Sequence, residues 1–269
     1  MHRLILIETS TALCSVALAE NGAVTAYRES SAPKAHASLT AVFVQEVLAE
    51  RGLTLADCDA VCVSKGPGSY TGLRVGVSTA KGLCFGSGKP LIAVGTLDTL
   101  VAQAHEDIAG QAGTVTPSDT QTVIPSEVEG SATAYKYIIP MIDARRMEVY
   151  SAVFDRCVTP DDPSVILSDS EGSAQYPQIT PTAPVIVDEN SFAEYLEQGP
   201  CLFIGDGAGK CADVIKHPNA HFHQCNPKAS AMLQPALDAY KEKRFEDVAY
   251  FEPFYLKEFV ATVSKKKLF

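Results

Sequence analysis

The stretch SKGPGSYTGLRVGVSTAKG, residues 64–82, contains five glycines. It begins at the end of a strand-like run and continues into a helical pattern. A P-loop needs GxxxxGK followed by Ser or Thr, and a dinucleotide site needs GxGxxG, whereas the spacing here is GxGxxxG. Gly72, Gly76 and Ala80 instead lie four residues apart on one helix face. Because each glycine costs a helix about 1 kcal/mol, this stripe predicts a close approach by another segment, which we expect to be a helix.

The elements around this stretch predict a duplicated fold. Three strand-like runs precede the first helical pattern, and the hairpin signal Asn21–Gly22 joins the second run to the third. The order βββαβαβα then recurs beyond residue 135, which predicts two α/β halves with mixed sheets. The first half is predicted as strands 3–8, 14–20 and 23–28, helix 36–51, strand 60–64, helix 72–86, strand 91–95 and helix 96–105. The second half is predicted as strands 137–142, 148–154 and 184–187, helix 190–197, strand 201–205, helix 208–216, strand 220–224 and helix 228–243.

Polar segments divide the chain into two domains, predicted at 1–105 and 135–260. Residues 106–134 are rich in Gly, Thr, Ser and Pro and predict a loop or disordered insert, and a second insert is expected near 160–182. A ten-residue element occurs in both, as VIPSEVEGSA at 123–132 and VILSDSEGSA at 165–174. We interpret the two copies as surface insertions without a part in the chemistry. A basic tail, 261–269, ends the chain.

The composition favours a soluble, cytoplasmic protein whose cysteines are reduced. The 269 residues are 46% hydrophobic, enough for two ordinary cores, and the first apolar run is too short to span a bilayer. Eight cysteines lie mostly inside apolar runs without a CxxC pair. The formal net charge of −10 argues against direct binding of a nucleic-acid backbone, so any contact with nucleic acid is expected through a partner.

Helix 36–51 carries two apolar stripes where a surface helix carries one. One contains Ala37, Ala41, Val44 and Leu48, and the other Leu39, Val42, Phe43 and Val47. The second stripe indicates extra burial, either beneath a partner subunit or within the chain's own fold, and the pattern does not separate the two.

Two acidic residues follow predicted strands and could face a cleft. Glu8, followed by Thr9, and Asp143 could hold the Mg²⁺ of a nucleotide through water, or could serve only in turns and caps. The glycine run GDGAGK, 205–210, loosely resembles a phosphate loop through Gly205 and Gly207.

Metal sites are weakly indicated. His105–Glu106 begins like the protease motif HExxH, but position 109 is Ala, which excludes that site. The residues His217, His221, His223 and Cys225 could bind zinc, and strand 220–224 would align three of them. We favour imidazoles at a strand edge, because no carboxylate lies nearby in sequence.

Four segments together resemble the bacterial TsaB (YeaZ) family over nearly the whole chain except the inserts. They are ILIETSTALCSVAL near the start, VSKGPGSYTGLRVGVSTAKGL, MIDARRMEVY at 141–150 and EPFYLKE at 252–258. The resemblance implies the actin, Hsp70 and sugar-kinase (ASKHA) superfamily of duplicated RNase H-like domains. It also implies a role in making N6-threonylcarbamoyladenosine, the tRNA modification beside the anticodon.

The resemblance further implies a non-catalytic scaffold. In that family TsaD transfers the threonylcarbamoyl group from its adenylate to tRNA, and the ATPase TsaE assists. TsaD-like chains carry a metal-binding HxxxH where this chain has Thr96 and Leu100, and Glu8 stands where many relatives carry Asp. We therefore expect no cofactor in this subunit, ATP and a metal ion in its partners, and at most a vestigial nucleotide site at Glu8, Thr9, Asp143, Gly205 and Gly207.

The same resemblance implies pairing through the two helices of the first domain. The expected contacts with TsaD, or with a second copy in a homodimer, are His36, Leu39, Phe43, Glu46, Arg74, Val75 and Thr79. Two other functions remain open. One is an active ATPase or small-molecule kinase of the same superfamily, and the other is a zinc-binding regulatory protein.

Overall fold

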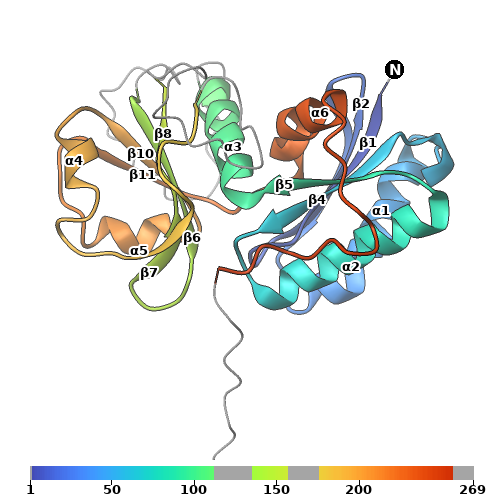
Figure 1. Ribbon diagram of the computed structural model, residues 1–269, viewed down its shortest axis with the longest axis horizontal. Coiled ribbons are helices and arrows are strands. Elements are labelled where there is room, and N and C mark those ends of the chain that lie inside the picture. Colours follow the sequence, from blue (N-terminus) through green and yellow to red (C-terminus); the bar gives the residue numbers. More distant parts are fainter. Residues whose placement is uncertain (1, 112–134, 157–175, 257–269) are drawn as a thin grey trace, which may run out of the picture.

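The first sheet is built from the strands that precede α3. The computed structural model describes residues 2–111, 135–156 and 176–256 (Figure 1). In chain order the first elements are β1 (Arg3–Glu8), β2 (Cys14–Glu20), β3 (Ala23–Ser30), α1 (Ala35–Glu50), the 3-10 turn η1 (Leu55–Asp57), β4 (Ala60–Gly66), α2 (Tyr70–Ser87), β5 (Leu91–Gly95) and α3 (Thr96–Gln111). The predicted order of this half is confirmed, although α3 continues beyond residue 105 into the expected insert.

Local sequence signals account for the turns and ends of these elements. Asn21 and Gly22 adopt positive φ angles of 54° and 83°, as a tight hairpin between β2 and β3 requires. The Ser69 side chain caps α2 by accepting a hydrogen bond from the Gly72 amide, and Gly88, with φ 68°, ends the helix in the left-handed conformation. The cap explains why α2 begins before the predicted residue 72.

The second half repeats the same types of element in shorter form. Its elements are β6 (Tyr137–Asp143), β7 (Glu148–Ser151), β8 (Phe154–Asp155), β9 (Ala183–Ile186), α4 (Ala193–Leu196), β10 (Cys201–Gly205), α5 (Ala208–Ala212), β11 (Ala220–Gln224), the 3-10 turn η3 (Ala229–Met232) and α6 (Leu233–Lys241). The predicted strand 148–154 is split, because the Val153 amide bonds to the Thr180 hydroxyl at 2.8 Å instead of continuing the ladder with β9.

The strand order demonstrates the duplication. The first sheet runs β3-β2-β1-β4-β5, and the second, read from β9, runs β9-β7-β6-β10-β11. The first three strands in each order pair antiparallel. Next, β4 and β10 pair in parallel with β1 and β6, and β5 and β11 extend the sheets in parallel from β4 and β10, while β8 pairs with β6 outside this order. The predicted pair of mixed α/β halves is therefore confirmed.

Each half completes its core with helices from the other half. The helices α1 and α2 cover one face of the first sheet, and η3 with α6, from the end of the chain, cover the other. In turn, α3 packs on the second sheet through Leu97, Leu100, Val101 and Ala104 (Figure 1). The predicted domain boundary at residue 105 thus falls inside a helix that belongs to the core of the second lobe.

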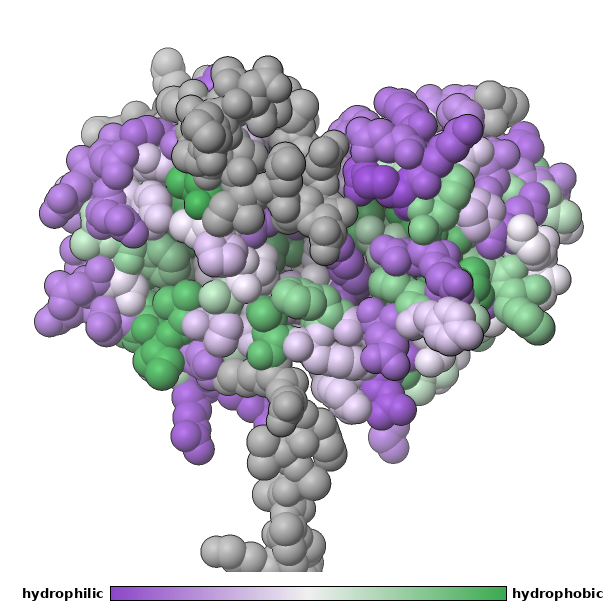
Figure 2. Space-filling view, in the orientation of Figure 1, coloured by the Kyte–Doolittle hydropathy of each residue, from purple (hydrophilic) through white to green (hydrophobic). Residues whose placement is uncertain are grey.

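Parts of the predicted inserts lie outside the described residues. These parts are 112–134 and 157–175, which contain both copies of the repeated element, and the basic tail also lies outside. Tyr176, within the second expected insert, is buried in the core of the second lobe. Among the helices that the structure describes, none is long and apolar enough to cross a membrane. Figure 2 shows hydrophilic residues gathered over the upper right lobe, where α6 lies.

Candidate functional site

The glycine face of α2 packs onto the loop that follows β1. A Cβ atom built on Gly68 would overlap the Ser10 carbonyl oxygen, one on Gly72 the Thr9 carbonyl oxygen, and one on Gly76 the Thr9 hydroxyl. The Ser69 amide also donates to the Ser10 carbonyl at 2.6 Å. The predicted close approach is thus present, but the prediction of a helix as the approaching segment is wrong.

Glu8 and Thr9 lie in the interior beneath α2. The Glu8 side chain is fully buried, and its Oε1 accepts hydrogen bonds from the Ser10 amide at 2.7 Å and the Ser64 hydroxyl at 2.8 Å. Burial raises the pKa of Glu8, against the lowering effect of these hydrogen bonds. Four buried oxygens here have no hydrogen-bond partner among the residues that the structure describes: Glu8 Oε2 and the hydroxyls of Thr9, Ser10 and Thr11.

Asp143 is neutralised by a lysine of its own chain. The Lys210 ammonium donates to the Asp143 carboxylate and to the carbonyls of Arg146 and Glu148 at 2.8 and 2.7 Å. Sequence reasoning missed this lysine, although it ends the glycine run 205–210. A fixed ammonium therefore fills the place beside this carboxylate where a metal ion was considered.

Gly205 and Gly207 serve the close packing of β10 and α5 against β6. Gly205 has φ 131°, and a Cβ there would overlap the Met141 carbonyl, to which the Gly207 amide donates at 3.0 Å. Between them, Asp206 accepts from the Asp143 amide at 2.8 Å. Burial, aided by the charge of Asp143, raises the pKa of Asp206 to about 6.

Two residues of this chain, Thr96 and Leu100, stand where TsaD-like chains carry the histidines of HxxxH, and both belong to the protein core. Thr96 and Leu100 are both fully buried, and Leu100 reaches to within 3.0 Å of a Cβ built on Gly205. Neither side chain offers a nitrogen ligand, so this pair cannot bind a metal as two imidazoles would.

A surface groove of about 480 Å³ lies between α1 and α2. Its lining contains three of the predicted interface residues, Arg74, Val75 and Thr79, together with Ala37, Tyr70, Thr71 and Ser78. Arg74 is held in place, because its guanidinium lies 5.3 Å from the centre of the Tyr70 ring and donates to the Tyr70 hydroxyl at 3.1 Å. The groove is therefore a preformed feature of the helix pair.

The predicted interface residues on α1 have different environments. His36 contacts the Thr11 carbonyl at 2.9 Å, Leu39 is half-buried against the core, and Glu46 is exposed and paired with Arg28 at 3.1 Å. Phe43 is only 7% exposed and packs in the core of the first lobe. Phe43 is thus a core residue and not a surface contact, which corrects that prediction.

Apolar side chains remain exposed on both helices. On α1, Val42 is 40% exposed, and on α2, Phe85 is 87% exposed. Phe85 lies on the outer stripe of α2 that also carries Arg74 and Ser78, at helical spacing. Large apolar residues left exposed on the two helices that form the groove are consistent with a protein-binding surface.

The segment that follows α6 returns to α2. Lys81 on α2 donates to the carbonyls of Ala249 and Phe251 at 3.1 and 3.0 Å, and the Phe254 amide donates to the Lys65 carbonyl at 2.7 Å. Further along, the Tyr255 ring lies 4.9 Å from the Tyr70 ring at the groove. Two of the sequence segments that carry the family resemblance, 252–258 and the glycine stretch, thus meet here.

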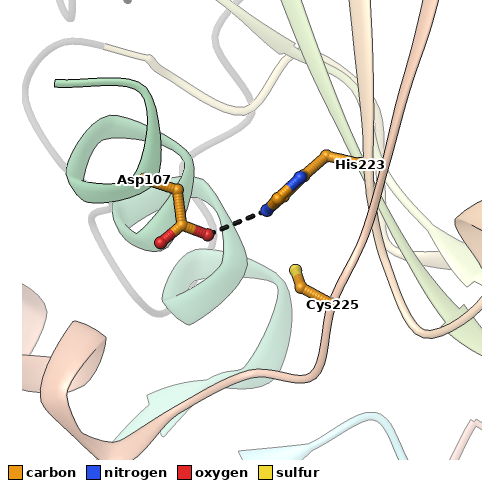
Figure 3. Close-up of side chains that lie close together, drawn as sticks. All are labelled: Asp107, His223 and Cys225. Atoms are coloured by element: carbon orange, nitrogen blue, oxygen red, sulfur yellow. Dashed lines mark hydrogen bonds and ion pairs between the residues drawn. The ribbon is translucent and has the colours of Figure 1, made fainter. Parts of the chain in front are cut away.

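The three histidines in and before β11 have different neighbours. His223 and Cys225 lie close to Asp107 of α3, and His223 Nε2 is 2.9 Å from Asp107 Oδ2 (Figure 3). His221 instead contacts the Tyr135 ring at 5.3 Å, and His217 accepts from the Asn219 amide. The sequence near these histidines contains no carboxylate, which weighed against a metal site. In the folded chain, Asp107 brings a carboxylate next to His223.

Comparison with known sequences places the chain among proteins of one tRNA modification. It is 30% identical over 264 residues, 96% of each chain, to the "tRNA threonylcarbamoyladenosine biosynthesis protein TsaB" of Escherichia coli (strain K12). It is 40% identical over 103 residues, 38% of this chain and 43% of the relative, to the protein of the same description from Haemophilus influenzae. The profile of the family described as "TsaD: tRNA N6-adenosine threonylcarbamoyltransferase" matches residues 29–116.

Comparison with solved structures supports the fold. "YeaZ from Pseudomonas aeruginosa" superposes with a TM-score of 0.71 at 22% identity, covering 95% of this chain and 100% of that one. A second Pseudomonas aeruginosa structure, described as similar to peptidase YEAZ, gives a TM-score of 0.72 over 96% and 100%. With the repeated strand order, these likenesses confirm the predicted α/β fold of two duplicated halves with mixed sheets.

Proposed function

This chain belongs to the TsaB (YeaZ) family, and we propose that it acts as a non-catalytic subunit in the synthesis of N6-threonylcarbamoyladenosine in tRNA. Its proposed direct partner is the transferase TsaD, with the ATPase TsaE as a further component. In this proposal the subunit needs no cofactor of its own, and tRNA contacts it only through the complex. The formal net charge of −10 is consistent with that indirect contact.

The observation that carries the proposal is that the two sides of α2 make different contacts. Its glycine side encloses the loop after β1 in the protein interior, and its outer side lines the groove with α1. Neighbours within the chain bind both candidate acids, since Ser10 and Ser64 donate to one oxygen of Glu8 and Lys210 donates to Asp143. A chain that uses these elements for packing and offers an exposed helix face is suited to binding a partner.

The groove and its surroundings suit an interface of moderate size. The lining is neutral except for Arg74, and exposed Val42 and Phe85 add apolar area on the same two helices. Interface energy usually concentrates in a few such aromatic and arginine residues. The same face would pair two copies of this chain when the partner is absent.

Nucleoside analysis tests the pathway. Depletion of this protein in its own host, followed by mass spectrometry of total tRNA nucleosides, is expected to lower threonylcarbamoyladenosine while other modified nucleosides stay constant. Unchanged threonylcarbamoyladenosine under verified depletion would contradict the proposal. ATP turnover by the isolated chain would instead favour the alternative of an active ATPase or kinase.

Ser78→Arg tests the partner surface. Ser78 is exposed and lines the groove, so an arginine there fills the groove without entering the core. We expect binding to purified TsaD to weaken by at least about tenfold, or about 1.4 kcal/mol, in calorimetric titration. The same variant is expected to reduce homodimer formation in sedimentation measurements.

The matched control is Ile186→Arg. Ile186 is 76% exposed on β9, in the other lobe, and is likewise a surface side chain replaced by arginine. TsaD affinity should stay unchanged in this variant. Equal weakening by both substitutions, or by neither, would remove the groove from the interface.

A further inference from the structure

Three potential ligand atoms converge beside the end of β11. The carboxylate of Asp107, the imidazole of His223 and the thiol of Cys225 lie within 4.8 Å of one another, and Figure 3 shows all three pointing into one space. Asp107 comes from α3, whereas His223 and Cys225 come from β11 and the residue after its end. The three side chains are half-buried, so the space between them is sheltered without being closed.

The backbone that carries these side chains is held firmly. Cys225 donates its amide to the Gly205 carbonyl at 3.3 Å, which fixes it to the end of β10. Gln103, one helical turn before Asp107, donates to the Asn226 carbonyl at 3.1 Å and accepts from the Lys228 amide at 3.0 Å. The helix and the end of the strand are thus joined independently of the three candidate ligands, which is the preorganisation that a metal site requires.

The chemistry of the three groups fits zinc. A thiolate, an imidazole and a carboxylate are the three ligand types that Zn²⁺ accepts together, with metal–ligand distances of about 2.0–2.3 Å. In a tetrahedral site those distances place ligand atoms roughly 3.3–3.8 Å apart. The His223–Asp107 contact at 2.9 Å would open slightly and the sulfur would draw closer, both by rotation of side chains.

We propose that Asp107, His223 and Cys225 form a three-ligand zinc site with a fourth position open to solvent. On binding, the thiol releases its proton to water, and the proton between His223 Nε2 and Asp107 also passes to water as the metal takes that nitrogen. The imidazole then holds one proton, on Nδ1, and stays neutral. Two anionic ligands and one neutral imidazole balance the charge of the ion.

The position of the site gives the ion a structural consequence. The helix α3 follows the first sheet directly after β5, and residues 225–228 lead from the second sheet to η3 on the first lobe. A metal bound to both would tie together the two segments through which the chain passes between the lobes. Binding to the folded protein alone would also stabilise it by mass action.

Metal titration of the untagged full-length chain tests the site. Cys157 lies outside the described residues, so every protein is prepared both with and without Cys157→Ser. After removal of metals with a chelator, titration with Co²⁺ is expected to show a thiolate-to-metal charge-transfer band. Elemental analysis after dialysis against Zn²⁺ is expected to give one zinc per chain, with a higher midpoint of thermal unfolding.

Matched variants separate these ligands from other groups. Cys225→Ser is expected to abolish the charge-transfer band, and His223→Asn and Asp107→Asn to weaken zinc binding by at least about tenfold. His221 lies two residues before His223 on the same face of β11, and His221→Asn should leave zinc binding and the charge-transfer band unchanged. Circular dichroism verifies the fold of each variant. Substoichiometric zinc in the wild-type chain, or a band that survives Cys225→Ser, would overturn the proposal.

Discussion

Gly72 and Gly82 lie on the same helix in opposite surroundings. A Cβ on Gly72 would overlap the Thr9 carbonyl oxygen, which belongs to the backbone and cannot move aside cheaply, whereas nothing lies within 4 Å of a Cβ on Gly82. We expect Gly72→Ala to lower the free energy of unfolding by about 1–3 kcal/mol. Gly82→Ala should raise it by about 0.5–1 kcal/mol, because alanine loses less backbone entropy in a helix.

Urea unfolding followed by circular dichroism measures both changes. The paired substitutions share the same chemistry and the same helix, so a difference in sign isolates the contact with the loop after β1. Destabilisation of similar size at both positions would mean that the glycines serve helix flexibility and not close packing.

Single residues were the least predictable part of the sequence. The spacing of Gly72 and Gly76 correctly indicated a close approach, but spacing carries no information about the segment that approaches. On α1 both stripes are apolar, so periodicity could not place Phe43 in the core. Asp107 and His223 are 116 positions apart, and only the packing of α3 on the second sheet brings them together.

Lys81 of α2 makes two of the contacts that hold the C-terminal segment. Lys81→Met keeps the apolar stem but removes both hydrogen bonds to the Ala249 and Phe251 carbonyls. We expect the Phe254 amide, which donates to Lys65, to exchange its hydrogen about tenfold faster, since a hydrogen bond contributes about 0.5–1.5 kcal/mol. Nuclear magnetic resonance resolves that amide.

Lys89→Met provides the comparison for Lys81→Met. Lys89 also donates to a backbone carbonyl, that of Ala56 at 2.7 Å, but on the side of η1. Exchange at Phe254 should be the same in this variant as in the wild type. If Lys81→Met also leaves that exchange unchanged, the segment is held by its other contacts.

The sequence predicted the type and order of the helices and strands more accurately than the residues at which the helices end. Strands 3–8, 14–20, 91–95, 201–205 and 220–224 have the predicted bounds, because each is a short apolar or alternating run between turn signals. The helices α4 and α5 are shorter than predicted, since short apolar runs do not determine where a helix ends. The division of 148–154 depends on Thr180, which no local pattern reveals.

The molecule as a whole should unfold in one step. Met232 of η3 is fully buried in a core formed with β1, β2, β4 and β5, and Leu100 of α3 is fully buried in the core of the other lobe. Each lobe therefore depends on a helix or turn from the other half of the chain. We expect Met232→Ala to destabilise both lobes together by about 2–5 kcal/mol.

Amide hydrogen exchange at Ile5 of β1 and Phe203 of β10 reports on the two lobes separately. Both amides should lose the same protection free energy in Met232→Ala, whereas Ile186→Ala, at an exposed site, should change neither. Loss at Ile5 alone would show that the lobes unfold independently.

The duplication could be predicted because the order βββαβαβα is written twice in the sequence. The exchange of covering helices between lobes could not, because a helical pattern at 96–105 or 228–243 indicates an apolar face without indicating which sheet it meets. For the same reason the predicted domain limits follow the inserts, while α3 extends past residue 105.

The covering of the first sheet by η3 and α6 also bears on how the protein is made. A ribosome synthesises β1, β2, β4 and β5 first, yet residues 229–239 that close their second face emerge only after every strand of the second sheet described here. Until then the nascent chain presents an open apolar sheet, the kind of surface on which aggregation begins and which chaperones bind. The sheet that is synthesised first is thus covered on its second face only after the strands of the other lobe have been made.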